Sequence, residues 1–282
     1  MPPSMSMTSP AFSWHHLGDW NFGILPSLLL VGATVAYVMG VTRTPSWPRT
    51  RLGWFFGGVL TTFVATQSVI GSFDMSYFSI HMIQHLMLIM VAAPFFALSA
   101  PSDLVRTAGP EPLRRLLDSR VADVLFHPLT GFVVYLVLIP LTHLTGLTNV
   151  MMTHPWVHHA EQIGFLISGY LFFRVAFGRE SGRTLHPGLR LVYVMAAVPV
   201  DTFTGLALVM STHQPIPSYA QMAPTGTSAA WQLGNVHLGG AIMWIGGDAL
   251  MLLACIPIVL IWVRWETLRT KELDAELDAL GL

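Results

Sequence analysis

Charged residues are scarce in this chain of 282 residues: Asp, Glu, Lys and Arg together make up 10% of it, against about a quarter of a typical soluble domain. Hydrophobic residues make up 53%, and the mean hydropathy is +0.58. This composition excludes a soluble globular domain. It also excludes disordered, collagen-like and coiled-coil chains, which are polar, built of triplet repeats or rich in charged heptads. We therefore expect the chain to lie in a lipid bilayer.

Cysteine and N-terminal basic residues are also nearly missing. The single cysteine, Cys255, excludes a disulfide framework and a CxxC redox or thiolate metal centre. No Lys or Arg occurs up to Trp20, so the charged n-region of a cleavable signal peptide is lacking, and we expect the first apolar run to remain as a membrane span. A formal net charge of −1 provides no global field that would attract nucleic acid.

Long apolar runs are abundant instead. A helix that crosses the hydrocarbon layer needs about 20 mostly apolar residues, and the continuous runs here are too long for the alternating strands of a membrane barrel. They predict helices, in which the backbone satisfies its own hydrogen bonds. The seven predicted spans are Phe22–Val41, Leu52–Ile70, Phe78–Ala100, Pro128–Leu147, Val157–Phe177, Leu189–Met210 and Val236–Val263.

We thus predict an all-α, polytopic membrane protein with a single integral membrane domain over residues 1–282. It comprises an outer tail (1–21), a seven-helix bundle (22–263) and a cytoplasmic tail (264–282) that prolongs the last helix. Apolar residues at helical spacing between Leu113 and Val124, among charged neighbours, predict a helix that lies in the inner membrane interface.

Every basic residue falls in one of four segments on the same side of this arrangement. They are Arg43, Arg49 and Arg51; Arg106, Arg114, Arg115 and Arg120; Arg174, Arg179, Arg183 and Arg190; and Arg264, Arg269 and Lys271. Because basic residues collect on the cytoplasmic side of short loops, this separation predicts an outer N-terminus and an inner C-terminus.

Histidines have the opposite distribution. Of the 12, only His127 and His186 fall on the inner side. Neutral imidazole binds Zn, Cu, Fe and Ni, so a histidine-rich outer end indicates a metal site. The ten outer histidines are His15, His16, His81, His85, His143, His154, His158, His159, His213 and His237.

Spacing narrows the candidates. His81 and His85 are four residues apart, so both rings project from one face of the third predicted helix. His154 and His158 repeat this spacing where the fifth helix begins, and Glu161 follows His158 by three residues. A carboxylate inside the membrane is costly unless paired, so Glu161 is either an ion ligand or the acceptor that orients an imidazole.

We expect helices three, five and seven to be neighbours, which would bring His81, His85, His158 and His237 together. The full set of candidate metal ligands is His81, His85, His158, His237, Glu161, His154, His159 and His143.

Methionine is the other abundant type, with 15 residues. Its thioether is a soft ligand that favours Cu(I), so histidine and methionine without thiolate indicate copper. Methionine also fills membrane cores, and Asp201 and Asp248 suit either an ion path or a buried hydrogen-bond network. The outer methionines are Met5, Met7, Met75, Met82, Met151, Met152, Met210, Met222 and Met243.

Three segments resemble the CtaG family of seven-helix assembly factors for caa3-type cytochrome c oxidase. They are His81–Leu88 (HMIQHLML), His158–Gln162 (HHAEQ) and Asn235–Asp248 (NVHLGGAIMWIGGD). Asn235 stands where an Asp is expected, and Gln162 where many members have a His. The resemblance implies a multi-pass protein of the bacterial plasma membrane that helps to load copper into the oxidase. Its partners would be an oxidase subunit and a copper donor protein, and it would not be an enzyme.

Other functions would also account for these histidines and acids. The pairs at four-residue spacing also resemble the histidine boxes of di-iron membrane oxidoreductases, although those boxes face the cytoplasm. A haem protein would need axial histidines on two helices, and a transporter would use Asp201 and Asp248 as an ion path. A membrane metalloenzyme, with di-iron or haem, is the main alternative.

Overall fold

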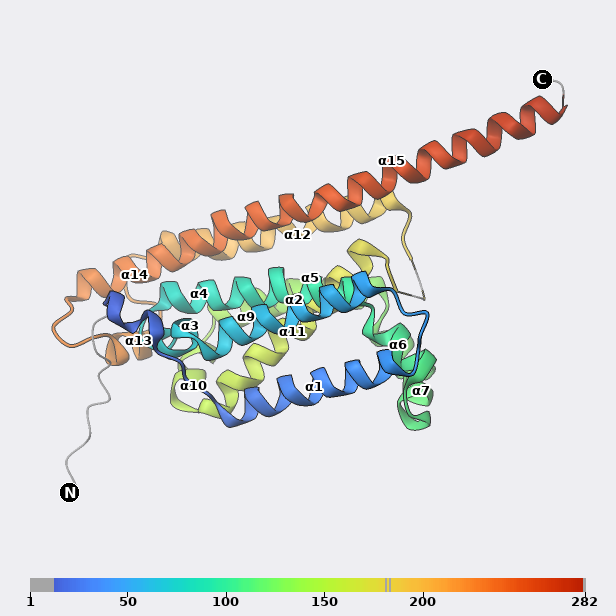
Figure 1. Ribbon diagram of the computed structural model, residues 1–282. Coiled ribbons are helices and arrows are strands. Elements are labelled where there is room, and N and C mark those ends of the chain that lie inside the picture. Colours follow the sequence, from blue (N-terminus) through green and yellow to red (C-terminus); the bar gives the residue numbers. More distant parts are fainter. Residues whose placement is uncertain (1–12, 181, 183, 281–282) are drawn as a thin grey trace.

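The computed structural model describes residues 13–180, 182 and 184–280, and every regular element in this part of the chain is a helix. The long helices run side by side, so the molecule is an elongated bundle (Figure 1). The predicted all-α class is confirmed. Met5, Met7 and Arg183 lie outside the described residues, as does the side chain of Met152.

The first half of the bundle contains three helical runs. They are α1 (Ile24–Thr42), α2 (Arg49–Gln67) with the short α3 (Val69–Phe73), and a run formed by α4 (Phe78–Met87), η2 (Leu88–Ala92) and α5 (Ala93–Ser99). One short helix precedes them and three follow: η1 (Trp14–Gly18), then α6 (Pro101–Ala108), α7 (Glu111–Leu117) and α8 (Arg120–Leu125).

The second half contains α9, α11, α12 and a long final run. Three of these helices begin with proline, whose missing N–H costs nothing in a first turn. Their bounds are α9 (Pro128–His143), α11 (Pro155–Phe177), α12 (Pro187–Val209), and α14 (Ala229–Ala241) with η3 (Ile242–Gly246) and α15 (Gly247–Leu280). The short helices α10 (Leu147–Thr153) and α13 (Pro217–Met222) lie in the connections.

Each predicted span coincides with one of these helical runs, but five of the runs are long and apolar enough to be candidate spans. These are Ile24–Thr42, Arg49–Phe73, Phe78–Ala108, Pro187–Val209 and Ala229–Leu280. The helix α9 has only 16 residues, and α11 contains His158, His159, Glu161 and Gln162, which lower its hydropathy. The number of seven spans and the orientation remain predictions.

The run α4–η2–α5 lies at the centre of the bundle and is not a uniform α-helix. Pro94, near the start of α5, has no amide hydrogen, so the α-helical hydrogen-bond ladder is interrupted there. The preceding residues form the π-helical turn η2. Such turns are frequent at functional sites, and this one begins three residues after His85.

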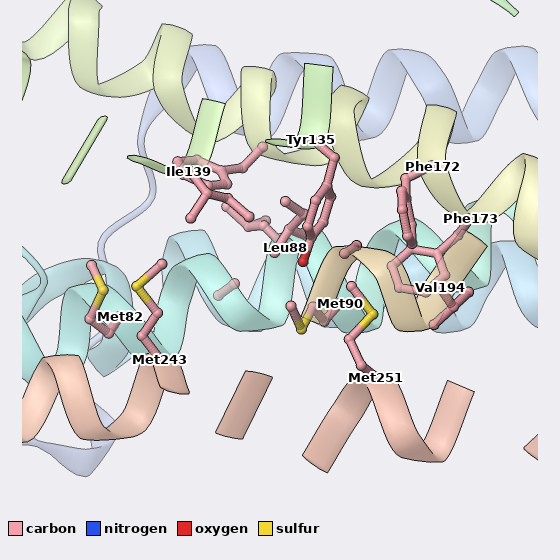
Figure 2. Packing of buried hydrophobic residues seen from close by; sticks show 14 of the residues in the cluster. Met82, Leu88, Met90, Tyr135, Ile139, Phe172, Phe173, Val194, Met243 and Met251 are labelled. Carbon is pink, nitrogen blue, oxygen red and sulfur yellow. The ribbon is translucent and has the colours of Figure 1, made fainter. Parts of the chain in front are cut away.

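The helices approach one another closely where glycines face a neighbour. A Cβ on Gly169 of α11 would stand 2.4 Å from the carbonyl oxygen of Ile89 in η2. A Cβ on Gly205 of α12 would stand 2.6 Å from the carbonyl oxygen of Gly240 in α14. Small residues that let backbones approach are typical of membrane helix interfaces. Around these contacts lies a core of large side chains, including Met82, Tyr135, Phe172 and Met243 (Figure 2).

The two ends of the bundle differ in their chemistry. The helices α3, α10 and α13 lie at one end, and α6 and α7 lie at the other (Figure 1). At the second end, a buried ion pair joins Arg174 Nε to Glu180 Oε2 at 2.6 Å, and the hydroxyl of Tyr170 donates to the same carboxylate. Helices α7 and α8 expose apolar side chains such as Leu116 and Val121, as an interfacial helix would.

Candidate metal centre

His81 and His85 lie on the inner face of α4. Their spacing of four residues places the two rings side by side, with centroids 4.0 Å apart. His81 is completely buried, and His85 is 4% exposed. The predicted pair therefore points into the bundle and not to lipid.

His143, the last residue of α9, completes a triad with this pair. Its Nε2 lies 3.2 Å from Nδ1 of His85. Its Nδ1 lies 2.8 Å from the carbonyl oxygen of Ile139, and since a carbonyl only accepts, that nitrogen carries the hydrogen. The Nε2 of His143 therefore presents a lone pair to the centre of the cluster, as a metal ligand does.

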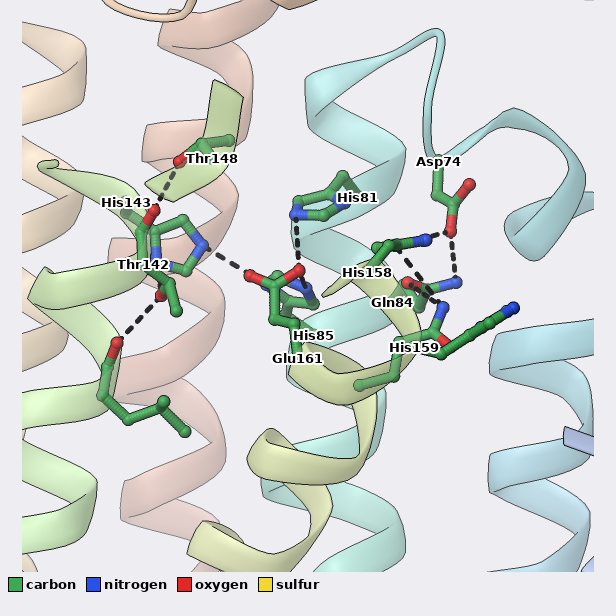
Figure 3. A network of polar contacts seen from close by, with 12 residues as sticks. Asp74, His81, Gln84, His85, Thr142, His143, Thr148, His158, His159 and Glu161 are labelled. Atoms are coloured by element: carbon green, nitrogen blue, oxygen red, sulfur yellow. Dashed lines mark hydrogen bonds and ion pairs between the residues drawn. The ribbon is translucent and has the colours of Figure 1, made fainter. Parts of the chain in front are cut away.

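The helix α11 contributes His158 and Glu161 from its first two turns. One carboxylate oxygen of Glu161 lies 3.5 Å from Nε2 of His85 and 3.9 Å from Nε2 of His81. The ring centroid of His158 lies 5.7 Å from that of His81. The i, i+3 spacing that the sequence displays thus brings both side chains to the α4 pair (Figure 3).

Asp74, in the connection before α4, lies on the other side of His81. Its Oδ2 is 3.4 Å from Nε2 of His158 and accepts a hydrogen bond of 2.7 Å from the Gln84 amide. Gln84 in turn accepts a hydrogen bond of 3.1 Å from Gln162. Burial raises the pKa of Asp74 to about 7, although the hydrogen bond from Gln84 acts in the opposite direction.

Several buried polar atoms of the cluster have no hydrogen-bond partner. They are both ring nitrogens of His81, Nε2 of His85 and both carboxylate oxygens of Glu161. Buried polar atoms are nearly always paired, and leaving one unpaired costs about 1–3 kcal/mol. Imidazole nitrogen and carboxylate oxygen are metal ligands, so a cation bound among them would satisfy these atoms.

Two groups of side chains have the spacing of metal ligands. His81, His85 and His143 form one, and Asp74, His81 and His158 form the other. Within each group, one ligand atom from every residue lies within 4.8 Å of the others. Ligands at about 2 Å from a shared ion stand about 3–4 Å apart, so small side-chain rotations would close either site.

The remaining candidate ligands lie outside both groups. Nε2 of His237 is 2.9 Å from the carbonyl oxygen of Ser211, although α14 does pack against α4. His154 is exposed, with Nδ1 3.2 Å from the carbonyl oxygen of Val150. His159 faces Gln162 at 3.4 Å.

Methionine sulfur lies close to one side of the cluster. Met82 and Met243 line a small cavity of about 20 Å³ together with His85, His143 and Asp201. The carboxylate of Asp201 accepts a hydrogen bond of 2.8 Å from the Tyr135 hydroxyl. Asp248 accepts from Thr202 at 3.0 Å, so both acids are hydrogen-bonded, Asp201 in the core and Asp248 at a partly buried position.

Sequence reasoning missed two residues at the centre. Asp74 follows α3 in the turn that precedes α4, so no helical spacing relates it to His81. Tyr219 of α13 covers the cluster: its hydroxyl donates to the Asp74 carbonyl oxygen at 3.1 Å, and its ring lies 5.8 Å from that of His81. No local pattern marks this tyrosine.

Comparison with known proteins identifies related chains. A family model described as cytochrome c oxidase caa3 assembly factor (Caa3_CtaG) matches residues 35–265, which include the whole cluster. An uncharacterized protein of Mycobacterium bovis is 28% identical over 279 residues, covering 92% of this chain and 42% of its own length. An uncharacterized protein of Mycobacterium leprae is 26% identical over 262 residues, covering 87% of this chain and 40% of its own length. The chain thus spans about two fifths of the length of these relatives. No solved structure matches it.

Proposed function

Because the chain belongs to the family of cytochrome c oxidase caa3 assembly factors, we propose that it binds copper through the buried histidine cluster and passes it to an oxidase subunit during assembly. A copper donor protein at the outer side would supply the ion. Copper is the cargo in this proposal and not a resident cofactor.

One observation carries the proposal: five buried ligand atoms, on His81, His85 and Glu161, face one another without a hydrogen-bond partner. An arrangement of this kind is unfavourable in a membrane protein unless a cation binds there. Thiolate is not part of the cluster, since Cys255 lies against the sulfur of Met195 on α12. Imidazole ligands with methionine nearby suit copper and allow it to leave by ligand exchange.

The residues of the cluster have distinct roles in this function. His81, His85, His143 and His158 are the ligands that exchange. Glu161 provides a negative charge that offsets part of the charge of the ion within the bundle. Gln84 holds Asp74 in place by its hydrogen bond, as the supporting partners of metal ligands generally do.

We further propose that α9 and α11 also cross the bilayer, which gives seven spans with the N-terminus outside. Both helices pack against the candidate spans: α11 against α5, and α9 against α12. The cluster lies where α4 and α11 begin and α9 ends, and α6 and α7, with their arginines, lie at the opposite end (Figure 1). The cluster would therefore be near the outer surface of the plasma membrane. A reporter fused after Leu282 should be active only in the cytoplasm, and activity only in the outer compartment would overturn this orientation.

Elemental analysis of the purified full chain tests the copper proposal. After incubation with copper and removal of the free ion, wild-type protein should retain copper, and the double variant His81→Ala/His85→Ala should retain almost none. His213→Ala is the matched control, because His213 is exposed at the same end and faces only Thr212. Equal copper in the wild type and the double variant would refute the assignment.

The same preparation tests the metalloenzyme alternative. Imidazole and carboxylate also suit iron, so bound iron in place of copper would favour a di-iron protein. A Soret band in the optical spectrum would indicate haem. Copper bound by imidazoles gives no such band, so we expect none.

A further inference from the structure

The ligands of the cluster divide into two groups that share a single residue. Asp74, His81 and His158 form one group, and His81, His85 and His143 form the other. Figure 3 shows Asp74 and His143 on opposite sides of His81. An ion held between Asp74 and His158 would therefore occupy a different place from one held between His85 and His143.

We propose that the cluster has two adjacent copper positions, which share His81 and differ in the oxidation state of the ion that they hold. We call them the Asp74 position and the His143 position. The inference rests on the proposed function and adds where in the cluster each oxidation state of copper binds.

His81 is suited to this shared role. It is completely buried, and neither of its ring nitrogens has a hydrogen-bond partner, so no hydrogen bond must be broken before it binds an ion in either position. Glu161 belongs to neither group, but its carboxylate lies 3.9 Å from His81 and 3.5 Å from His85. Its charge therefore acts on an ion near the shared ligand in both positions.

The two positions differ in the metal that they favour. The Asp74 position offers one carboxylate oxygen and two imidazoles, a harder set that suits Cu(II). The His143 position offers three imidazoles and borders the cavity lined by Met82 and Met243. Soft thioethers beside neutral nitrogens favour Cu(I). The two oxidation states are thus separate probes of the two positions.

Two conservative variants distinguish the positions. With Cu(II) added alone to the full chain, Asp74→Asn should lower the affinity by more than about 10-fold, the smallest loss typical even of outer-sphere partners. It should also change the electron paramagnetic resonance spectrum, because a neutral amide replaces the carboxylate ligand. With Cu(I) added alone, in competition with a chromogenic chelator, the same variant should bind as the wild type does. His143→Gln should lower the affinity for Cu(I) and leave that for Cu(II) unchanged. His81→Ala should lower the affinity for both ions.

A second variant at each position controls for a folding defect in the first. Helix content and gel-filtration behaviour would reveal such a defect. His158→Gln should repeat the effect of Asp74→Asn, and His85→Gln that of His143→Gln. If each variant lowers the affinities for Cu(I) and Cu(II) to the same degree, the cluster is a single site. The two-position inference is then wrong, although the protein still binds copper. If wild-type protein binds copper in neither oxidation state, the proposed function fails together with the inference.

Discussion

Among the single residues, Glu161 is the least expected, because its acidic side chain is buried within the bundle. It is 6% exposed, it lies within the second turn of α11, and neither oxygen has a hydrogen-bond partner. A buried carboxylate without a partner is strongly unfavourable, whereas one beside a bound cation is not. Glu161 is therefore best explained as part of a site that is stable with a cation present.

Replacing this carboxylate by an amide tests that explanation. Glu161→Gln keeps the size of the side chain but removes its charge, so the affinity for copper should fall about 10–100-fold, the range typical for residues that support metal ligands. The affinity is measured by chelator competition on purified protein. Asp248→Asn serves as control, since Asp248 accepts hydrogen bonds from Thr202 away from the cluster. Unchanged affinity in Glu161→Gln would show that the carboxylate does not act on the ion.

Helical spacing in the sequence accounts for part of the cluster. The pairs His81/His85 and His158/Glu161 each lie within one helix, and the rules for i, i+4 and i, i+3 neighbours place them correctly. His237 shows the limit of such reasoning: the predicted spans place it at the same level as the other histidines, but its Nε2 faces the Ser211 carbonyl oxygen. Spacing gives the depth of a side chain, whereas its direction depends on how each helix is rotated in the bundle.

At the scale of elements, the close contact between α11 and the run η2–α5 fixes the relative position of their ligands. This contact depends on Gly169, where a Cβ would lie 2.4 Å from the Ile89 carbonyl oxygen and 2.7 Å from Cβ of Ala93. Any larger side chain must push α11 away from η2, and His158 and Glu161 move with α11.

We therefore expect Gly169→Val to lower the free energy of unfolding by about 1–3 kcal/mol, the usual cost of overpacking, and to weaken copper binding as well. Thermal unfolding in detergent and copper titration measure the two effects. Gly164→Ala is the control in the same helix, because the nearest atom to its Cβ, in Leu138, would be 3.9 Å away. A Gly169→Val protein as stable as Gly164→Ala would contradict the packing argument.

The short helix α13 covers the cluster from the connection between α12 and α14. Tyr219 contacts Phe78 and His81, and Ser218 next to it donates to the Asn149 side chain at 2.7 Å. With this cover in place the ligands are buried, so we infer that an ion bound to them would exchange only when α13 moves. Loops and short connections usually supply such movable covers.

Removing the ring of Tyr219 should therefore speed up copper exchange. In Tyr219→Ala we expect faster dissociation of copper into a chelator, with the stoichiometry unchanged. Stopped-flow absorbance measures the rate. Tyr219→Phe keeps the ring and loses only the hydrogen bond to the Asp74 carbonyl oxygen, so its rate should stay close to that of the wild type. Equal rates in all three proteins would show that α13 does not limit exchange.

Apolar runs predicted the elements well, because hydrophobic length is the main constraint on membrane helices. The predicted Phe78–Ala100 span coincides with α4, η2 and α5, which end at Ser99. The π turn η2 was not predicted from the sequence, although Pro94, which interrupts the α-helical hydrogen bonds there, is visible in it. Nor does the sequence show which way the polar residues of α11 point: His158, Glu161 and Gln162 are buried within the bundle.

At the scale of the whole molecule, the two kinds of polar side chain lie at opposite ends of one bundle. Histidines with unpartnered nitrogens lie where α4 begins, and the ion pair of Arg174 and Glu180 lies at the other end. The part of the chain that matches the family of oxidase assembly factors thus contains the buried set of imidazole ligands. We expect these ligands to bind copper.

X-ray absorption at the copper edge of the loaded, purified full chain identifies the atoms that surround the ion. We expect a first shell of nitrogen and oxygen atoms at about 2.0 Å with the outer scattering of imidazole, and the loss of that signal in His81→Ala/His85→Ala but not in His213→Ala. A first shell dominated by sulfur at about 2.3 Å, or imidazole scattering that persists in the double variant, would contradict this expectation.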